Sequence, residues 1–164
     1  MRHRTFLILP AALVALLVAA PVAAAKKTYK YSSTVRSAPV STSNGYPNVG
    51  GSAVFAGSLE STTFGRGAVI DRVTVTGQPQ PNVLAFQGTE LDFFADGAAA
   101  NTFTGTATVQ ADGSQTFVIR GRFTQGRRGG TGRYKGATGS YTFTGTIPAG
   151  ANVITGSSTG TMTF

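Results

Sequence analysis

The stretch GGTGRYKGATGSYTFTGT, residues 129–146, holds six glycines and ends in a clean alternation of polar and apolar residues. In its second half, Tyr141, Phe143 and Gly145 fall on one face of an extended strand, opposite serine and threonine side chains. A phosphate-binding loop would instead need a helix directly after the glycines. The stretch therefore predicts a glycine-rich corner that leads into a half-buried strand at residues 138–147.

The same alternation recurs along the chain and is interrupted by Gly, Asp and Pro. Thr, Val, Phe and Tyr favour pleated strands, whereas glycine disfavours helix. The prolines and glycines of residues 37–52 and 78–82 predict loops, residues 95–100 predict a turn, and Asp112-Gly113 predicts a hairpin. We expect eight strands, at residues 28–36, 53–60, 66–76, 83–94, 101–111, 115–124, 138–147 and 153–164.

Glycines in the middle of these strands favour a barrel over a sandwich. Phe-Thr-Gly-Thr occurs at residues 103–106 and again at residues 143–146, each time with the glycine on the apolar face. Such a glycine weakens a strand unless it permits a bend or the close approach of another backbone, and a closed barrel needs such bends. We therefore expect an all-β protein, an eight-stranded antiparallel up-and-down barrel whose interior is wide enough for one small ligand.

The first 25 residues have the layout of a secretory signal peptide. Two arginines give a basic start, residues 6–20 are almost continuously apolar, and a run of alanines ends at Ala25. The apolar run is shorter than the ~20 residues of a membrane-spanning helix, although an uncleaved anchor is the alternative. We expect secretion with cleavage after Ala25, an N-terminal strand and linker at residues 26–52, and a barrel domain at residues 53–164.

Cysteine is absent, and the single histidine, His3, lies in the expected leader. The chain therefore has no disulfide, no zinc-thiolate site and no cysteine nucleophile. Without His3 the mature chain also lacks the commonest general base and metal ligand, and with it a Ser-His-Asp triad. We expect neither a cofactor nor a metal site.

The mature chain is basic, because 12 of the 14 Lys and Arg residues remain after the leader, against 6 acidic residues. Half of those 12 fall within one short segment, at Arg120, Arg122, Arg127, Arg128, Arg133 and Lys135. Such a segment could bind a polyanion, for example an anionic envelope polymer, with a strong dependence on salt. The alternative is a solvated edge that protects against strand-to-strand aggregation. Specific binding of nucleic acid is not expected.

Two of the carboxylates are candidate catalytic residues. Glu90 and Asp92 lie on one face of the strand at residues 83–94, but both faces of this strand carry large apolar residues. Periodicity therefore leaves open which face points inward. If the pair lines a pocket, it could act as general acid and base. Asp71, beside Arg72, is a weaker candidate of the same kind.

The segment GGTGRYKGATG at residues 129–139 resembles a signature of the allene oxide cyclase and dirigent barrels. In that signature GGTG is followed by a basic residue, an aromatic residue and, further on, Ala and Gly. Bacterial allene oxide cyclase-like secreted proteins are similar in their Thr/Gly-rich strands, and the resemblance covers residues 66–164. It implies a calycin-type barrel with an apolar cavity, in which plant members position reactive intermediates. It also implies oligomerisation, since plant members are often trimers. The cyclase's catalytic glutamate has no matching position here, so the resemblance carries the fold and not the chemistry.

Three functions remain open at this point. The first is a secreted, cofactor-free barrel that either binds a small apolar or aromatic molecule or has a non-catalytic role in the envelope. The residues expected to line its interior are Phe117, Ile119, Phe123, Tyr141 and Phe143. The second is an isomerase, cyclase or dirigent-type enzyme that uses Glu90 or Asp92. The third is binding of a polyanion through the arginine-rich segment.

Overall fold

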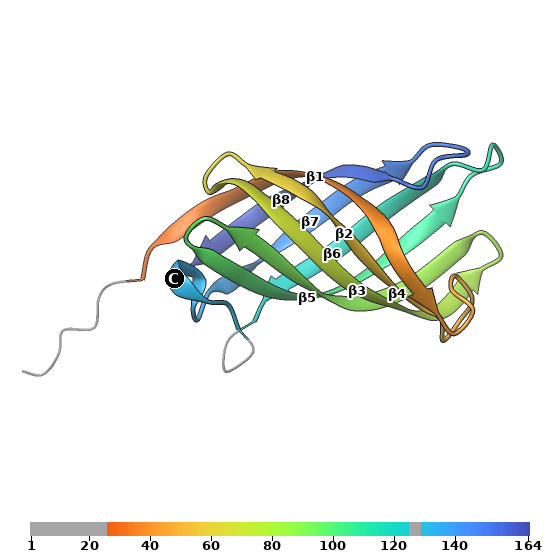
Figure 1. Ribbon diagram of the computed structural model, residues 1–164. Coiled ribbons are helices and arrows are strands. Elements are labelled where there is room, and N and C mark those ends of the chain that lie inside the picture. The colour runs from red at the N-terminus through yellow and green to blue at the C-terminus, as the bar shows by residue number, and fades with distance from the viewer. Residues whose placement is uncertain (1–25, 125–128) are drawn as a thin grey trace, which may run out of the picture.

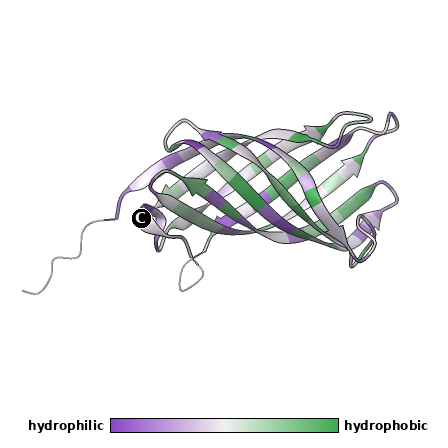
Figure 2. Ribbon diagram, in the orientation of Figure 1, coloured by the Kyte–Doolittle hydropathy of each residue, from purple (hydrophilic) through white to green (hydrophobic). Residues whose placement is uncertain are grey.

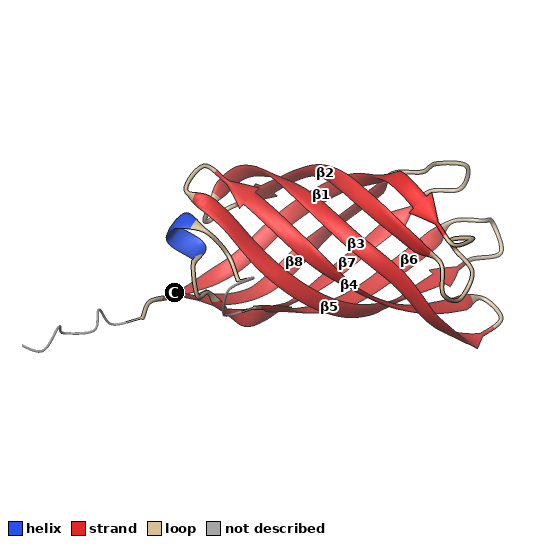
Figure 3. Cartoon of the chain, turned by 60° about the horizontal axis from the view of Figure 1, so that its bottom comes forward, coloured by secondary structure: helices blue, strands red, loops and turns tan. Residues whose placement is uncertain are grey.

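The computed structural model describes residues 26–124 and 129–164 as a closed barrel of eight strands (Figure 1). Each strand pairs antiparallel with the next along the chain, and β8 pairs with β1 to close the barrel (Figure 3). The predicted all-β, up-and-down architecture is confirmed. A short 3-10 helix, η1 (Gly132–Tyr134), lies between β6 and β7. The strands are β1 (Thr28–Ser43), β2 (Ser52–Ser61), β3 (Gly65–Gln80), β4 (Val83–Phe94), β5 (Gly97–Val109), β6 (Gln115–Phe123), β7 (Thr138–Ile147) and β8 (Ile154–Thr163).

Two strands, β1 and β3, continue well into the loops that the sequence predicts after them. β1 does not end at residue 36 but pairs with β2 as far as Ser43, so the predicted loop at residues 37–52 shrinks to residues 44–51. β3 continues past Gly77 to Gln80, which removes most of the loop predicted at residues 78–82. In both strands the register shifts beside a proline, at Pro39 and at Pro79. Proline is tolerated at such bulges because it has no N–H to contribute to the ladder.

The predicted hairpin at Asp112-Gly113 is confirmed. The backbone N–H and the hydroxyl of Ser114 donate to Asp112 Oδ1, over 2.9 and 2.6 Å. Gly113 has a φ of 82°, in the left-handed region that glycine adopts without strain. The turn predicted at residues 95–100 is shorter than expected, since β5 begins at Gly97.

Aromatic rings fill the interior by stacking over glycines that face inward. Apolar and polar residues alternate along the strands (Figure 2), and the apolar positions form one continuous core. A Cβ on Gly121 would overlap the ring of Tyr141, and a Cβ on Gly105 would lie 2.8 Å from the ring of Phe86. These two glycines therefore leave room for rings from neighbouring strands, whereas at Gly145, in the second Phe-Thr-Gly-Thr, the space is taken by the ring of Phe143 from the same strand.

One end of the barrel is closed by four rings, which we call the aromatic cap: Phe64, Phe94, Tyr134 and Phe164. Tyr134, in η1, is only 1% exposed, and its ring centroid lies 5.2–5.5 Å from those of the other three. The C-terminus and η1 lie at this end, whereas four strand-to-strand loops gather at the opposite end (Figure 1). Any opening into the barrel is therefore expected at the loop end.

Across residues 26–124 and 129–164, no helix has the length and apolar character needed to cross a membrane.

Candidate functional site

A cavity of about 280 Å³ lies inside the barrel and is lined by residues of all eight strands. Its walls are mostly apolar and include Phe55, Phe103, Phe117, Ile119 and Phe143. The loops at the end opposite the aromatic cap contribute Tyr46, Pro47, Ala151 and Asn152. A concave, largely apolar space with few polar groups is typical of small-molecule sites, whose volumes usually begin near ~300 Å³. The cavity therefore suits one small molecule.

Three carboxyl groups and three other polar side chains form one cluster in the interior, and Tyr31, Asp71 and Glu90 of this cluster line the cavity. We call this group the acid cluster: Tyr31, Asp71, Glu90, Asp92, Asn101 and Tyr141. Sheet register brings them together, because Asp71 on β3 pairs with Glu90 on β4, and Glu90 pairs with Asn101 on β5. Asp92 follows two residues later on the same face of β4. Tyr31 and Tyr141 approach from β1 and β7, each paired with Gly160 of β8.

Hydrogen bonds orient the two carboxyl groups of β4. Glu90 Oε1 accepts from Asn101 Nδ2 over 2.6 Å and from the hydroxyl of Tyr141 over 3.0 Å. Asp92 Oδ2 accepts from the hydroxyl of Tyr31 over 3.1 Å and from Asn101 Nδ2 over 3.3 Å. Asp71 Oδ1 and Asn101 Oδ1 are buried and have no hydrogen-bond partner among the described residues. Hydrogen bonds thus fix Glu90 and Asp92, whereas two acceptor oxygens of the cluster have no donor within the described part of the chain.

Burial raises the pKa of all three carboxyl groups. Loss of water raises the pKa of Asp71 from 3.8 to about 7, and repulsion from Asp92 adds to the effect. Loss of water together with repulsion from Asp71 raises the pKa of Glu90 from 4.5 to about 8. The pKa of Asp92 is raised well above its usual value by burial and by Glu90. Every described lysine and arginine is exposed, so none of them offsets the raised pKa values, and at neutral pH Glu90 stays largely protonated while Asp71 is partly ionised.

The same environment keeps the two phenols of the cluster protonated. Burial, followed by the nearby carboxylates, raises the pKa of Tyr31 and of Tyr141 well above 10.0. Both hydroxyls therefore remain donors to the carboxyl groups across the physiological range. Within the described ranges, no group of three His, Cys, Asp or Glu side chains could hold a metal ion.

The structure resolves which face of β4 points inward. Asp92 is 1% exposed, and Glu90 lines the cavity. The face of β4 that carries both carboxyl groups therefore points into the barrel. Leu91 and Phe93 point outward instead, and each is 40% exposed. Large apolar residues outside and carboxylates inside reverse the usual distribution. Asp71, the weaker candidate, joins the same site.

Three of the five predicted ligand-binding residues, Phe117, Ile119 and Phe143, line the cavity. Phe123 and Tyr141 lie in the core, where the ring of Phe123 packs 5.6 Å from that of Tyr141, measured between centroids. Sequence reasoning missed Tyr31 and Asn101 as polar members of the site. A signal was available for Tyr31, which shares a strand face with Ser33 and Val35. Asn101 shares a face with Phe103, but only its pairing with Glu90 reveals its role.

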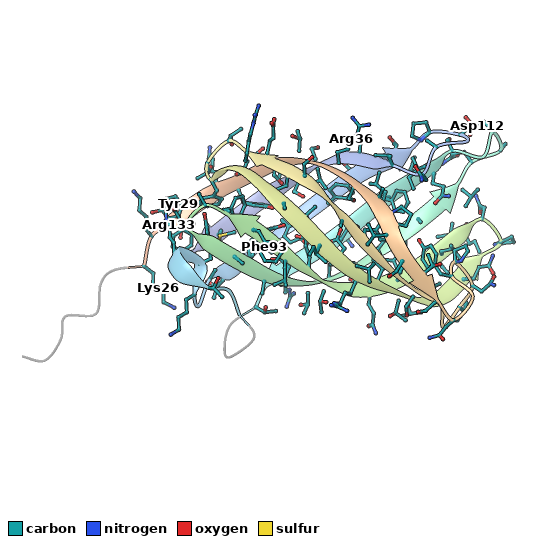
Figure 4. The ribbon with its side chains drawn as sticks, in the orientation of Figure 1. Lys26, Tyr29, Arg36, Phe93, Asp112 and Arg133 are labelled. Atoms are coloured by element: carbon teal, nitrogen blue, oxygen red, sulfur yellow. The ribbon has the colours of Figure 1, made fainter. Side chains whose placement is uncertain are left out.

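The described members of the predicted basic segment differ in their surroundings. Arg120 and Arg122 are exposed on the outer face of β6, where with Arg72 they line a threonine-rich hollow. Arg133 is paired with Asp96 over 3.4 Å, and its guanidinium lies over the rings of the cap end (Figure 4). Lys135 is exposed. Arg127 and Arg128 lie outside the described residues.

No protein-family model matches the chain, and no curated protein sequence matches it either. The resemblance of residues 129–139 to the allene oxide cyclase and dirigent barrels thus stays a prediction. The function has to be inferred from the geometry of the cavity and the acid cluster.

Proposed function

We propose that this protein is a secreted barrel that binds one small apolar or aromatic molecule in its interior cavity. The observation that carries the proposal is a cavity of about 280 Å³ whose walls are mostly aromatic and aliphatic and whose polar lining includes Asp71 and Glu90. Each Å² of apolar ligand surface removed from water contributes about 25 cal/mol. Secretion is proposed from the basic and apolar layout of residues 1–25 alone.

The two ends of the barrel support a direction of entry. The aromatic cap closes one end with rings that are in mutual contact. At the other end the cavity is lined by loop residues, among them Tyr46 and Pro47 after β1 and Asn152 before β8. A ligand would enter between these loops and place its polar group near Asp71 and Glu90.

Filling the cavity should weaken binding of the ligand. Ile119→Trp places a large ring in the cavity, and we expect it to weaken binding of 2-phenylethanol at least about tenfold, because the ligand and the new ring need the same space. Isothermal titration calorimetry measures the affinity. Val118→Trp is the matched control, because Val118 is the adjacent residue but points outward and is 45% exposed. Equal affinity in both variants would contradict an interior site.

An enzyme that transfers protons is the second candidate. It is favoured by one observation: Glu90 lines the cavity with a pKa raised to about 8, close to the working pH that suits a general acid or base. The hydroxyl of Tyr141 lies 3.0 Å from Glu90 Oε1 and orients it.

This second candidate predicts turnover of an unsaturated fatty-acid epoxide that depends on Glu90. Glu90→Gln should lower kcat by about 100-fold or more, the usual contribution of a general acid or base. The exposed Glu60, which pairs with Arg66 over 2.9 Å on the outer surface, supplies the control Glu60→Gln. Product analysis by mass spectrometry measures the rate. Turnover that survives both Glu90→Gln and Asp92→Asn would rule out the acid–base role.

A further inference from the structure

When its carboxyl groups are ionised, the acid cluster has more hydrogen-bond acceptors than donors. Its donors in that state are the hydroxyls of Tyr31 and Tyr141 and the amide of Asn101, and all of them are directed at Glu90 Oε1 and Asp92 Oδ2. Asp71 Oδ1 and Asn101 Oδ1 are left without a partner among the described residues. An unpaired buried acceptor costs free energy, so the cluster favours a ligand that brings donors.

The shortage of hydrogen-bond donors is not limited to the carboxylates, because it also affects the side-chain amide of Asn101. Its side chain is 2% exposed and points into the cluster, since its Nδ2 donates to both Glu90 and Asp92. The amide donors are therefore used, while the carbonyl oxygen of the same group remains unpaired. Asp71 and Glu90 both line the cavity, so their carboxyl groups are the ones that a ligand in the cavity can approach.

The cavity walls beside the carboxyl groups favour a cation with an apolar body. Phe55 pairs in register with Asp71, and the rings of Tyr31, Phe103 and Phe143 line the same cavity. The faces of aromatic rings attract organic cations, and they do so more strongly where water is excluded. All described lysines and arginines are exposed, so no cation of the described chain occupies this position.

We propose that the ligand is an amine whose protonated nitrogen is held by Asp71 and Glu90, with an apolar or aromatic body packed against the rings of the cavity. This inference rests on the proposed ligand-binding function and names its ligand class. A protonated primary amine brings three N–H donors and a positive charge, whereas an alcohol of the same shape brings one donor and no charge. The acid cluster discriminates between the two.

Binding of such an amine is linked to protons. The titratable groups that face Glu90 are Asp71 from β3, Asp92 from β4, and the phenols of Tyr31 and Tyr141 from β1 and β7. The phenols keep their protons, so only the carboxyl groups change charge near neutral pH. Since the pKa values of Asp71 and Glu90 are raised to about 7 and about 8, raising the pH creates the negative charge that attracts the amine.

The test compares 2-phenylethylamine with 2-phenylethanol by isothermal titration calorimetry at about pH 6 and about pH 8.5, on either side of the pKa values of Asp71 and Glu90. The amine should bind about tenfold or more tightly at the higher pH, whereas the affinity of the alcohol should change less than about threefold. Phenylacetate, of similar shape but opposite charge, should bind more weakly than the alcohol at the higher pH.

Two variants locate the effect. Glu90→Gln and Asp71→Asn should each lower the affinity for 2-phenylethylamine about tenfold at the higher pH and leave 2-phenylethanol bound, while Glu60→Gln should change neither. Either variant alone suffices if the other does not fold. Equal affinities for amine and alcohol in the wild type would overturn the amine inference and leave the proposed function standing. Failure of both compounds to bind would overturn both.

Discussion

Asp71→Asn and Glu90→Gln are expected to make the barrel more stable at about pH 8 and to flatten the pH dependence of its stability. In the wild type, the free energy of unfolding should fall as the pH rises from about 4 to about 8. The two substitutions remove carboxyl groups that are costly to ionise inside the barrel, and the amides that replace them stay neutral. Urea denaturation at a series of pH values measures the effect.

The sign follows from the raised pKa values. Below about pH 4 both the folded and the unfolded chain hold these protons, so the carboxyl groups favour neither state. As the pH rises, the unfolded chain ionises first, whereas Asp71 and Glu90 keep their protons up to about 7 and about 8. Ionisation therefore stabilises the unfolded state over this window.

The size of the effect should be easy to measure. Each unit of difference in pKa corresponds to about 1.4 kcal/mol, and allowing for water in the cavity we expect a total fall on the order of 2–4 kcal/mol. Glu60→Gln, on the exposed surface, should leave the profile unchanged. A wild-type stability that is constant between about pH 4 and about pH 8 would show that the carboxyl groups are not buried as described.

Tyr134→Ala is expected to cost about 3–5 kcal/mol of stability, the usual loss when a large buried ring is removed. Tyr134 is 1% exposed and contacts the rings of Phe64, Phe94 and Phe164. Its removal leaves a void between elements that are far apart in sequence. Urea denaturation at constant pH measures the loss.

Tyr134→Phe is the control, because it keeps the ring and removes only the hydroxyl. It should change the stability by less than about 1 kcal/mol. A loss below about 1 kcal/mol in Tyr134→Ala would mean that the aromatic cap does not close this end of the barrel.

The strands could be predicted because their alternation is regular. The strands predicted at residues 83–94 and 138–147 have the same bounds as β4 and β7 in the structure. Two of the errors arose at prolines, since Pro39 and Pro79 read as loop residues but sit at bulges where β1 and β3 continue. Register shifts of this kind depend on the neighbouring strand and leave no local signal.

The site was only partly predictable. Glu90 and Asp92 could be named, but their direction depends on the pairing of β4 with β3 and β5, because both faces of the strand are apolar enough to be buried. Asn101 is a common residue type in an otherwise ordinary strand, so its role emerges only when Glu90 is placed beside it. The aromatic cap depends on rings as far apart as Phe64 and Phe164, and alternation cannot reveal such contacts.

The central claim is that the cavity binds a ligand next to the acid cluster. Carboxyl ¹³C NMR, recorded as a pH titration with and without 2-phenylethylamine, tests this claim most directly. Without the amine, Asp71 and Glu90 should titrate near pH 7 and pH 8, because they are buried beside each other. With the amine, both midpoints should move to lower pH, because a bound cation favours the ionised carboxylates. Midpoints near 4 in the free protein, or midpoints that the amine leaves unchanged, would contradict the account.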